Sequence, residues 1–333
     1  MFTARDILYT AILPAAVAFA AMLLAWRPWR RHAAADALPP GQILPDVLGD
    51  PAEVPPPAPA RNGAWGAVGI GVGFLAAFAL LEGRLPPWPP AESKHFLFYF
   101  AALLTVLALL DAVVRWPGWL RQETALVASA CAVTFLFRSL LAGDTWPATE
   151  SVWRMLVMTL VLHAAWTSTE LLVAHLPRVA GPLLLFGFAT GSAGVILLSG
   201  SLVYARFAGA LAMGALAAVL ISCITRPFTL ARGGVTVVVP AVTALLFLAH
   251  HYVDPGLTPT NGALLLSALA LPWLAALPFI ARRGAWVRAV LAPLLAAAPV
   301  TVAAYRAHRT FREMETQTQT ESRSEGEADW NIQ

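Results

Sequence analysis

Residues 202–224 read LVYARFAGALAMGALAAVLISCI, and the only charged residue in this stretch is Arg206. As an α-helix the stretch rises about 34 Å, which is enough to cross the roughly 30 Å hydrocarbon core of a bilayer. An open strand cannot cross, because each unpaired backbone group costs several kcal/mol in lipid. The stretch therefore predicts a transmembrane helix.

Similar apolar runs recur along the whole chain. Together with residues 202–224, the apolar runs lie at roughly 7–25, 64–82, 95–114, 123–141, 152–173, 181–199, 202–224, 235–252, 263–281 and 286–305. Of the 333 residues 58% are hydrophobic and 12% are charged, whereas soluble domains are about 25% charged. The sequence therefore predicts an all-α, polytopic transmembrane helical bundle of about ten spans.

The arginines of the chain gather in alternate loops. If the N-terminus lies outside, the loops predicted to be cytoplasmic hold Arg27, Arg30, Arg31, Arg61, Arg115, Arg121, Arg178, Arg226, Arg232, Arg282, Arg283 and Arg288. The opposite loops hold far fewer basic residues, so the positive-inside rule favours this orientation. The charge asymmetry around residues 7–25 is the reverse of a secretory signal, so we expect this run to remain as a helix.

Other features of composition bear on location and partners. Lys94 is the only lysine among 22 basic residues, and this arginine bias is typical of a GC-rich bacterial genome. We therefore expect a bacterial inner membrane protein. The arginines lie in short loops, where they would meet anionic lipid headgroups, and they line no soluble face that would indicate nucleic-acid binding. The sequence predicts no cofactor.

The chain divides into four parts. Residues 1–37 form a first transmembrane helix with a basic cytoplasmic corner, and 61–305 form a bundle of about nine further helices. Residues 38–60 between them contain eight prolines and predict an extended cytoplasmic linker. Residues 306–333 are polar, and from Glu313 they lack an apolar period, so this C-terminal tail is expected to be disordered. The linker is read as a plain spacer or as a docking strip for a protein partner, and the tail could also bind one.

A basic aromatic corner occurs twice, as RWPGWLR at 115–121 and as RRGAWVR at 282–288. A shift of 167 residues places Arg115, Trp119 and Arg121 on Arg282, Trp286 and Arg288. Two explanations stay open, an internal parallel repeat with 4+2+4 helices and the general preference of membrane interfaces for Arg and Trp. In both cases these six residues are predicted to anchor the helices at lipid headgroups.

The fifth run carries the densest set of polar groups in any span. In MLVMTLVLHAAWTSTELLVAHL, residues 155–176, His163, Thr167 and Glu170 follow at helical spacing on one face,. Polar groups at membrane depth are costly and mark functional sites by default. This face is therefore a candidate site that points into the bundle, for a proton relay or for a cation or polar substrate, with structural hydrogen bonding as the alternative.

A second polar group lies at the outer end of the eighth run. His250, His251 and Asp254 resemble a metal ligand set only weakly, since they lack the spacing of a known motif,. Near other outer helix ends, Arg138 and Arg154 are expected to reach the interface, with binding of a substrate anion as the alternative.

Other residues are assigned to packing. Asp111 is expected to form a helix-end salt bridge with Arg115. Gly69 and Gly73 predict close helix packing, and Cys131 and Cys223 are expected to pack in the core.

No sequence motif identifies the function, so three hypotheses remain. A transporter for a small solute or ion is suggested by the number of spans, the repeat and the polar face of the fifth run. A non-catalytic subunit or scaffold is suggested by the scarcity of charge within the spans and by the two segments outside the bundle. An enzyme acting on a lipid-linked substrate would need a cluster of Asp, His or Arg at one interface, and only His250, His251 and Asp254 come near this requirement.

Overall fold

The structure is a computed structural model, and it describes residues 4–26, 62–114, 116–142, 146–176, 179–224, 230, 233–281 and 285–330. These residues form helices and no strand. The first half contains α1 (Ala4–Ile7), the π-helix η1 (Leu8–Ile12), α2 (Leu13–Trp26), α4 (Asn62–Glu82), α5 (Ser93–Val113), α6 (Gly118–Leu136), α7 (Arg138–Ala142) and α8 (Ala148–His175). The second half contains α9 (Ala180–Leu198), α10 (Leu202–Ile224), α11 (Gly234–His251), α12 (Pro259–Ala270), the 3-10 helix η4 (Leu271–Ala276), α13 (Pro278–Ala281) and α14 (Ala285–Trp330).

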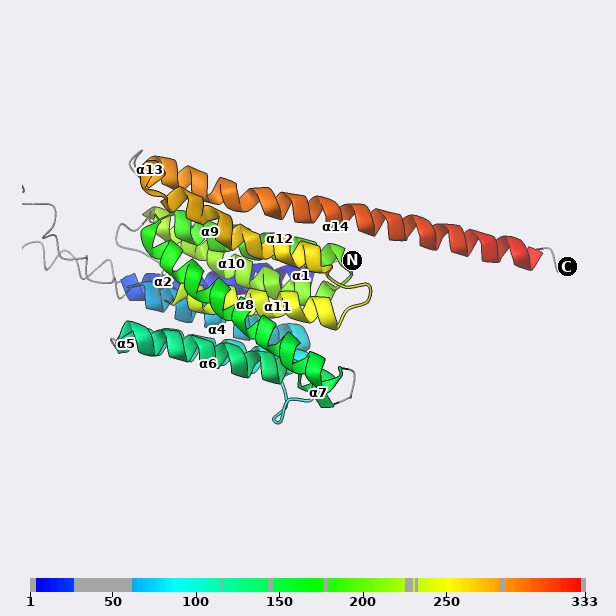
Figure 1. The fold of residues 1–333 in the computed structure, drawn as a ribbon, viewed down its shortest axis with the longest axis horizontal. Helices are drawn as coiled ribbons and strands as arrows, with labels where there is room; N and C mark the ends of the chain where they lie inside the picture. The colour runs from blue at the N-terminus through cyan, green and yellow to red at the C-terminus, as the bar shows by residue number, and fades with distance from the viewer. Residues whose placement is uncertain are drawn as a thin grey trace, which may run out of the picture.

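The helices lie side by side in one elongated bundle (Figure 1). Eight segments of the described chain are long and apolar enough to cross a membrane. The described apolar part of α4, Gly66–Glu82, is shorter, and α6 carries charged side chains in its first turns. The all-helical membrane bundle is thus confirmed, whereas the count of ten spans stays a prediction.

The two ends of the bundle are distinguished by what they carry. The N-terminus lies at the end where α11 meets α12 and where α8 begins (Figure 1), and we call this the N-terminal end. The opposite end carries the end of α5, the start of α6, the end of α8 and the start of α11. Helices α8 and α11 therefore run antiparallel and connect the same two ends.

Helix α11 occupies the centre of the bundle. It packs against α4, α5, α6, α8, α9, α10 and α12, and all but three of its residues are buried. A helix that is apolar on every face must be surrounded by other helices or by lipid, and here the surrounding groups are helices. Any pathway through the middle of this bundle would therefore run beside α11.

Helices α2 and α4 approach each other closely through small residues. A Cβ atom added at Gly69 would lie 2.8 Å from the Ala21 Cβ, and one at Gly73 would lie 2.9 Å from the Pro14 carbonyl oxygen. Both distances are too short for a real side chain. The predicted role of these two glycines in helix packing is confirmed.

The free cysteines do not pack where the sequence predicted. Cys131 and Cys223 are both exposed, so their assignment to the core was wrong. The outer surface of a membrane bundle is as apolar as its interior, because lipid surrounds it. An apolar neighbourhood in the sequence therefore cannot separate a buried position from a lipid-facing one.

The ninth and tenth helices differ from their predicted form. The run predicted at 263–281 is divided into α12, η4 and α13, and Pro272 lies at the start of the 3-10 turn. Helix α14 continues to Trp330 and extends well past the other helices at the N-terminal end (Figure 1), where the sequence predicted a disordered tail. Residues 306–317 favour helix locally, with an Arg309–Glu313 ion pair at i, i+4,. The Pro-rich segment 38–60 lies outside the described residues.

Candidate functional site

The buried face of α8 is offset from the face that the sequence singled out. Trp166, Thr169 and Glu170 are buried, whereas His163 and Thr167 are half-buried at the edge of this face. The Thr167 hydroxyl donates to the His163 carbonyl oxygen at 2.9 Å, within the same helix. Of the three predicted residues, only Glu170 is therefore joined to other helices by its side chain.

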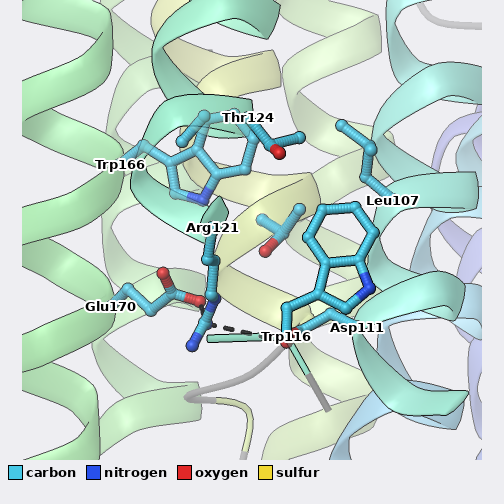
Figure 2. Close-up of a pocket in the computed structure, with 9 residues that line it drawn as sticks. Leu107, Asp111, Trp116, Arg121, Thr124, Trp166 and Glu170 are labelled. Atoms are coloured by element: carbon cyan, nitrogen blue, oxygen red, sulfur yellow. Dashed lines mark ion pairs between the residues drawn. The ribbon is translucent and has the colours of Figure 1, made fainter. Parts of the chain in front are cut away.

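Glu170 belongs to an ionic cluster that three helices build. The Arg121 guanidinium of α6 forms an ion pair with the Glu170 carboxylate of α8, and its Nη2 lies 3.7 Å from Oδ2 of Asp111 on α5. Figure 2 shows Arg121 between the two acidic side chains. We call Asp111, Arg121 and Glu170 the carboxylate–arginine cluster, and it ties α8 to α5 and α6 at the opposite end of the bundle.

A small cavity lies beside this cluster. Its volume is about 20 Å³, and its lining comprises Leu107, Asp111, Trp116, Arg121, Thr124, Ala125, Trp166, Glu170 and Thr236. A cavity needs roughly 10–15 Å³ to hold one water molecule, so this space admits water but no larger solute. Because Thr236 comes from the first turn of α11, the cluster closes the bundle next to its central helix.

The electrostatics of the cluster make it sensitive to loss of a partner. The side chains are only 10–23% exposed, so the charges are largely withdrawn from water. Desolvation offsets much of the attraction within such a group, but removing one partner leaves a buried charge uncompensated and costs about 3–5 kcal/mol. Loss of Arg121, the cation that both acids share, should therefore cost the cluster most.

This geometry bears on the prediction for Arg121 and leaves the prediction for Asp111 and Arg115 untested. Arg121 was expected to anchor at lipid headgroups, but in the structure its guanidinium turns inward to Asp111 and Glu170. Asp111 was expected to pair with Arg115, which lies outside the described residues. Two buried acids attract a guanidinium more strongly than a distant headgroup does, because their field is poorly screened in the bundle interior.

The other members of the repeated corner are only partly described. Arg115 and Arg282 lie outside the described residues. Trp119 and Trp286 are 68% and 75% exposed, as an interfacial anchor must be, and their anchoring role stays a prediction. The Arg288 Nη1 donates to the His175 carbonyl oxygen at the end of α8, at 3.2 Å. The matched arginines Arg121 and Arg288 thus both contact α8, while the repeat itself stays a prediction.

A much larger cavity opens between α8 and α11 at the N-terminal end. Its volume is about 420 Å³, and it is lined by Trp153, Arg154, Val157, Met158, His250 and His251. We call it the α8–α11 cavity. The same two helices therefore border a charged cluster with a water-sized cavity at one end and a much larger cavity at the other.

At this end the structure does not bring together the three weak candidates for metal ligands, His250, His251 and Asp254. The Nδ1 atom of His250 lies 2.6 Å from the Leu257 carbonyl oxygen. Asp254 is exposed and does not line the α8–α11 cavity. Within the described ranges, no group of three His, Cys, Asp or Glu side chains is placed to hold a metal ion. The enzyme hypothesis, which needed these residues to act together, gains no support from their arrangement.

The sequence carried a signal for the cluster that spacing arguments miss. Asp111, Arg121 and Glu170 all fall near helix ends on one predicted side of the membrane, so their charges lie at a common depth. Helical spacing relates residues of one helix only, and these three come from three helices. A search for oppositely charged residues that lie at the same membrane depth in different spans would have suggested the cluster.

Comparison of the chain with protein families, with curated proteins and with solved structures found no match. The assignment of class therefore comes from the fold itself. The long apolar helices define a multi-pass integral membrane protein with an all-helical bundle.

Proposed function

We propose that this protein transports a small solute or ion along the interface between α8 and α11. The observation that carries the proposal is the asymmetry of this interface. The carboxylate–arginine cluster closes one end, where the cavity holds only about 20 Å³, and the α8–α11 cavity opens the other end with about 420 Å³. A transporter in a state open to one side has this arrangement.

Polar groups between the two ends support the same pathway. His163 Nδ1 and Thr169 Oγ1 on α8 and Thr243 Oγ1 on α11 are buried, and in the described part of the chain they have no hydrogen-bond partner. Buried polar atoms are nearly always satisfied, so such exceptions need an explanation. A route for a hydrated or polar solute accounts for three of them on the two helices that connect the ends.

The orientation and location proposed for the protein follow from charge. We propose that both termini lie outside, that the carboxylate–arginine cluster is at the cytoplasmic end, and that the membrane is a bacterial inner membrane. The support is the set of arginine-rich loops that the sequence predicts on one side of the membrane,. Anionic lipid headgroups are then the partners of those loops.

Transport is tested by solute-gradient currents in proteoliposomes on a solid support, with a panel of inorganic ions, amino acids and short carboxylates. We expect at least one solute to evoke a current, and Glu170→Gln to reduce it about tenfold or more, because a neutral amide cannot balance Arg121. Glu313→Gln, which removes an exposed ion pair of α14, is the matched control. If folded protein yields no current with any solute, the transport proposal fails.

A non-catalytic subunit or scaffold remains the second candidate, and one observation favours it. Helix α14 extends beyond the bundle as a long helix (Figure 1), and Tyr305 and Phe311 on it are 68% and 41% exposed. An extended helix with exposed aromatic side chains suits binding to a protein partner. A variant with Tyr305→Ala and Phe311→Ala that folds normally but loses a co-purifying partner would support this role.

A further inference from the structure

The α8–α11 cavity has the size and the side chains of a ligand site. Its volume of about 420 Å³ falls in the range of roughly 300–1,000 Å³ typical of small-molecule pockets. Among the described residues that line it, Arg154, His250 and His251 are basic and none is acidic. Of these three side chains only the Arg154 guanidinium is permanently charged,. The lining therefore disfavours an ammonium group and favours an anion.

Arg154 is held in place from two directions. Its guanidinium carbon lies 4.9 Å from the centre of the Trp146 ring, and its Nη2 donates to Glu150 Oε1 at 2.5 Å. Glu150 is one turn earlier on α8 and occupies one edge of a guanidinium that has five N–H donors in a rigid plane. A planar fork that is already oriented matches the two oxygens of a carboxylate better than a flexible ammonium group would.

The two histidines are also oriented by their neighbours. The contact of His250 Nδ1 with the Leu257 carbonyl oxygen requires a proton on Nδ1, because a carbonyl oxygen only accepts. The His251 ring lies edge-to-face with Phe137 and with Trp146, at 5.2 Å between centroids in each case, and 4.4 Å from His250. Both rings therefore have fixed positions at the cavity and supply polar edges without the freedom of long side chains.

The remaining lining residues indicate what the anion carries. Trp153, Val157 and Met158 give the cavity an apolar wall on α8. Inorganic phosphate would be desolvated against this wall without gaining contacts, whereas the apolar part of an organic acid would be removed from water. The cavity thus combines one anion-binding group with a hydrophobic surface.

We propose that the α8–α11 cavity binds a small organic monocarboxylate, with Arg154 pairing the carboxylate and with Trp153, Val157 and Met158 contacting the apolar part. As a statement about substrate class this rests on the proposed transport function, in which the cavity is the entry site. As a statement about binding it stands on the cavity alone. Glu150 competes with the ligand for the Arg154 guanidinium.

The test is isothermal titration of the full-length protein in nanodiscs with benzoate, using neutral benzamide, cationic benzylamine and inorganic phosphate as comparison ligands. We expect saturable binding of benzoate and at least about tenfold weaker binding of the other three. If benzamide bound as tightly as benzoate, the negative charge of the ligand would not matter for binding. If phosphate bound more tightly than benzoate, the site would be selective for a different anion and the carboxylate proposal would be wrong. Absence of benzoate binding would overturn the proposal.

Variants separate the site from folding effects. Arg154→Gln should weaken benzoate binding about tenfold or more, whereas Arg309→Gln, which removes the exposed arginine of a similar ion pair on α14, should not change it. Glu150→Gln should strengthen binding, because it removes the competing carboxylate, and a gain cannot result from misfolding. Unchanged or weaker binding by a folded Glu150→Gln protein would contradict the proposed pairing.

Failure of this inference and failure of transport are distinguishable. Benzoate binding should persist in Glu170→Gln, since Glu170 does not line the α8–α11 cavity. Benzoate binding without any solute current would support the proposed binding site and contradict the proposed transport function. A current carried by solutes other than carboxylates, together with no benzoate binding, would support transport and contradict the proposed carboxylate site.

Discussion

Arg121 joins three helices through one side chain, because its guanidinium meets Asp111 of α5 and Glu170 of α8. The contacts are not equivalent in their consequences. Asp111 and Arg121 lie on the consecutive helices α5 and α6, which also pack against each other. Glu170 is the member of the cluster that lies on α8, so its charge contributes to holding α8 at this end of the bundle.

The cluster predicts an order of stabilities among its variants. Arg121→Gln leaves two buried acids without their shared cation and should destabilise the protein by about 3–5 kcal/mol. Glu170→Gln leaves Arg121 with Asp111, so its cost should be smaller, and the double variant should be more stable than Arg121→Gln alone. Chemical unfolding in detergent micelles measures this order. Equal costs for both single variants, or no rescue in the double variant, would show that the charges act independently.

The sequence identified Glu170 as important but assigned it the wrong neighbours. His163 and Thr167 share its helical face by spacing, yet the group that its carboxylate meets is Arg121 of α6, which also lies near Asp111. Spacing fixes which side chains of one helix lie together, whereas contacts between helices depend on how each helix is rotated and placed. That information is weak here because lipid-facing and core-facing surfaces have the same composition.

The helix pair α2 and α4 provides a test of packing. Gly73→Ala should destabilise the protein by about 1–3 kcal/mol or more, because the added methyl group would lie 2.9 Å from the Pro14 carbonyl oxygen. The matched control is Gly187→Ala in α9, where a Cβ would meet nothing within 4 Å. Thermal unfolding and accumulation in membranes compare the two. A stable Gly73→Ala protein would mean that α2 and α4 are farther apart than described.

Helix type and approximate bounds were predictable, whereas interruptions within helices were harder to place. Runs such as 202–224 coincide with α10 because length and apolarity alone determine a span,. The 3-10 turn at Leu271–Ala276 was missed although Pro272 lies at its start and Pro278 follows it. Proline is tolerated in membrane helices when neighbours satisfy the freed backbone groups. Proline in the sequence thus marks a place where the helix can break without showing that it does.

One helix pair carries polar features at both of its ends. Helices α8 and α11 border the carboxylate–arginine cluster at one end and the α8–α11 cavity at the other, and α11 is the most completely surrounded helix of the described chain. If the cluster releases α8, the small cavity beside Thr236 becomes continuous with solvent at its own end. We expect this end of the bundle to open when the Glu170–Arg121 ion pair is broken.

Side-specific labelling of a cysteine at Thr236 measures whether this end opens. Thr236 is 5% exposed and lines the small cavity, and replacement of Cys131 and Cys223 gives a cysteine-free chain. Cysteines at Trp88 and at Gly118 would mark the N-terminal end and the opposite end. An impermeant thiol reagent should label Thr236→Cys slowly in the otherwise unchanged protein. With Glu170→Gln added, labelling should be faster by on the order of tenfold, and only from the side that labels Gly118→Cys. Equal labelling rates with and without Glu170→Gln, or labelling from the side of Trp88→Cys, would contradict the account.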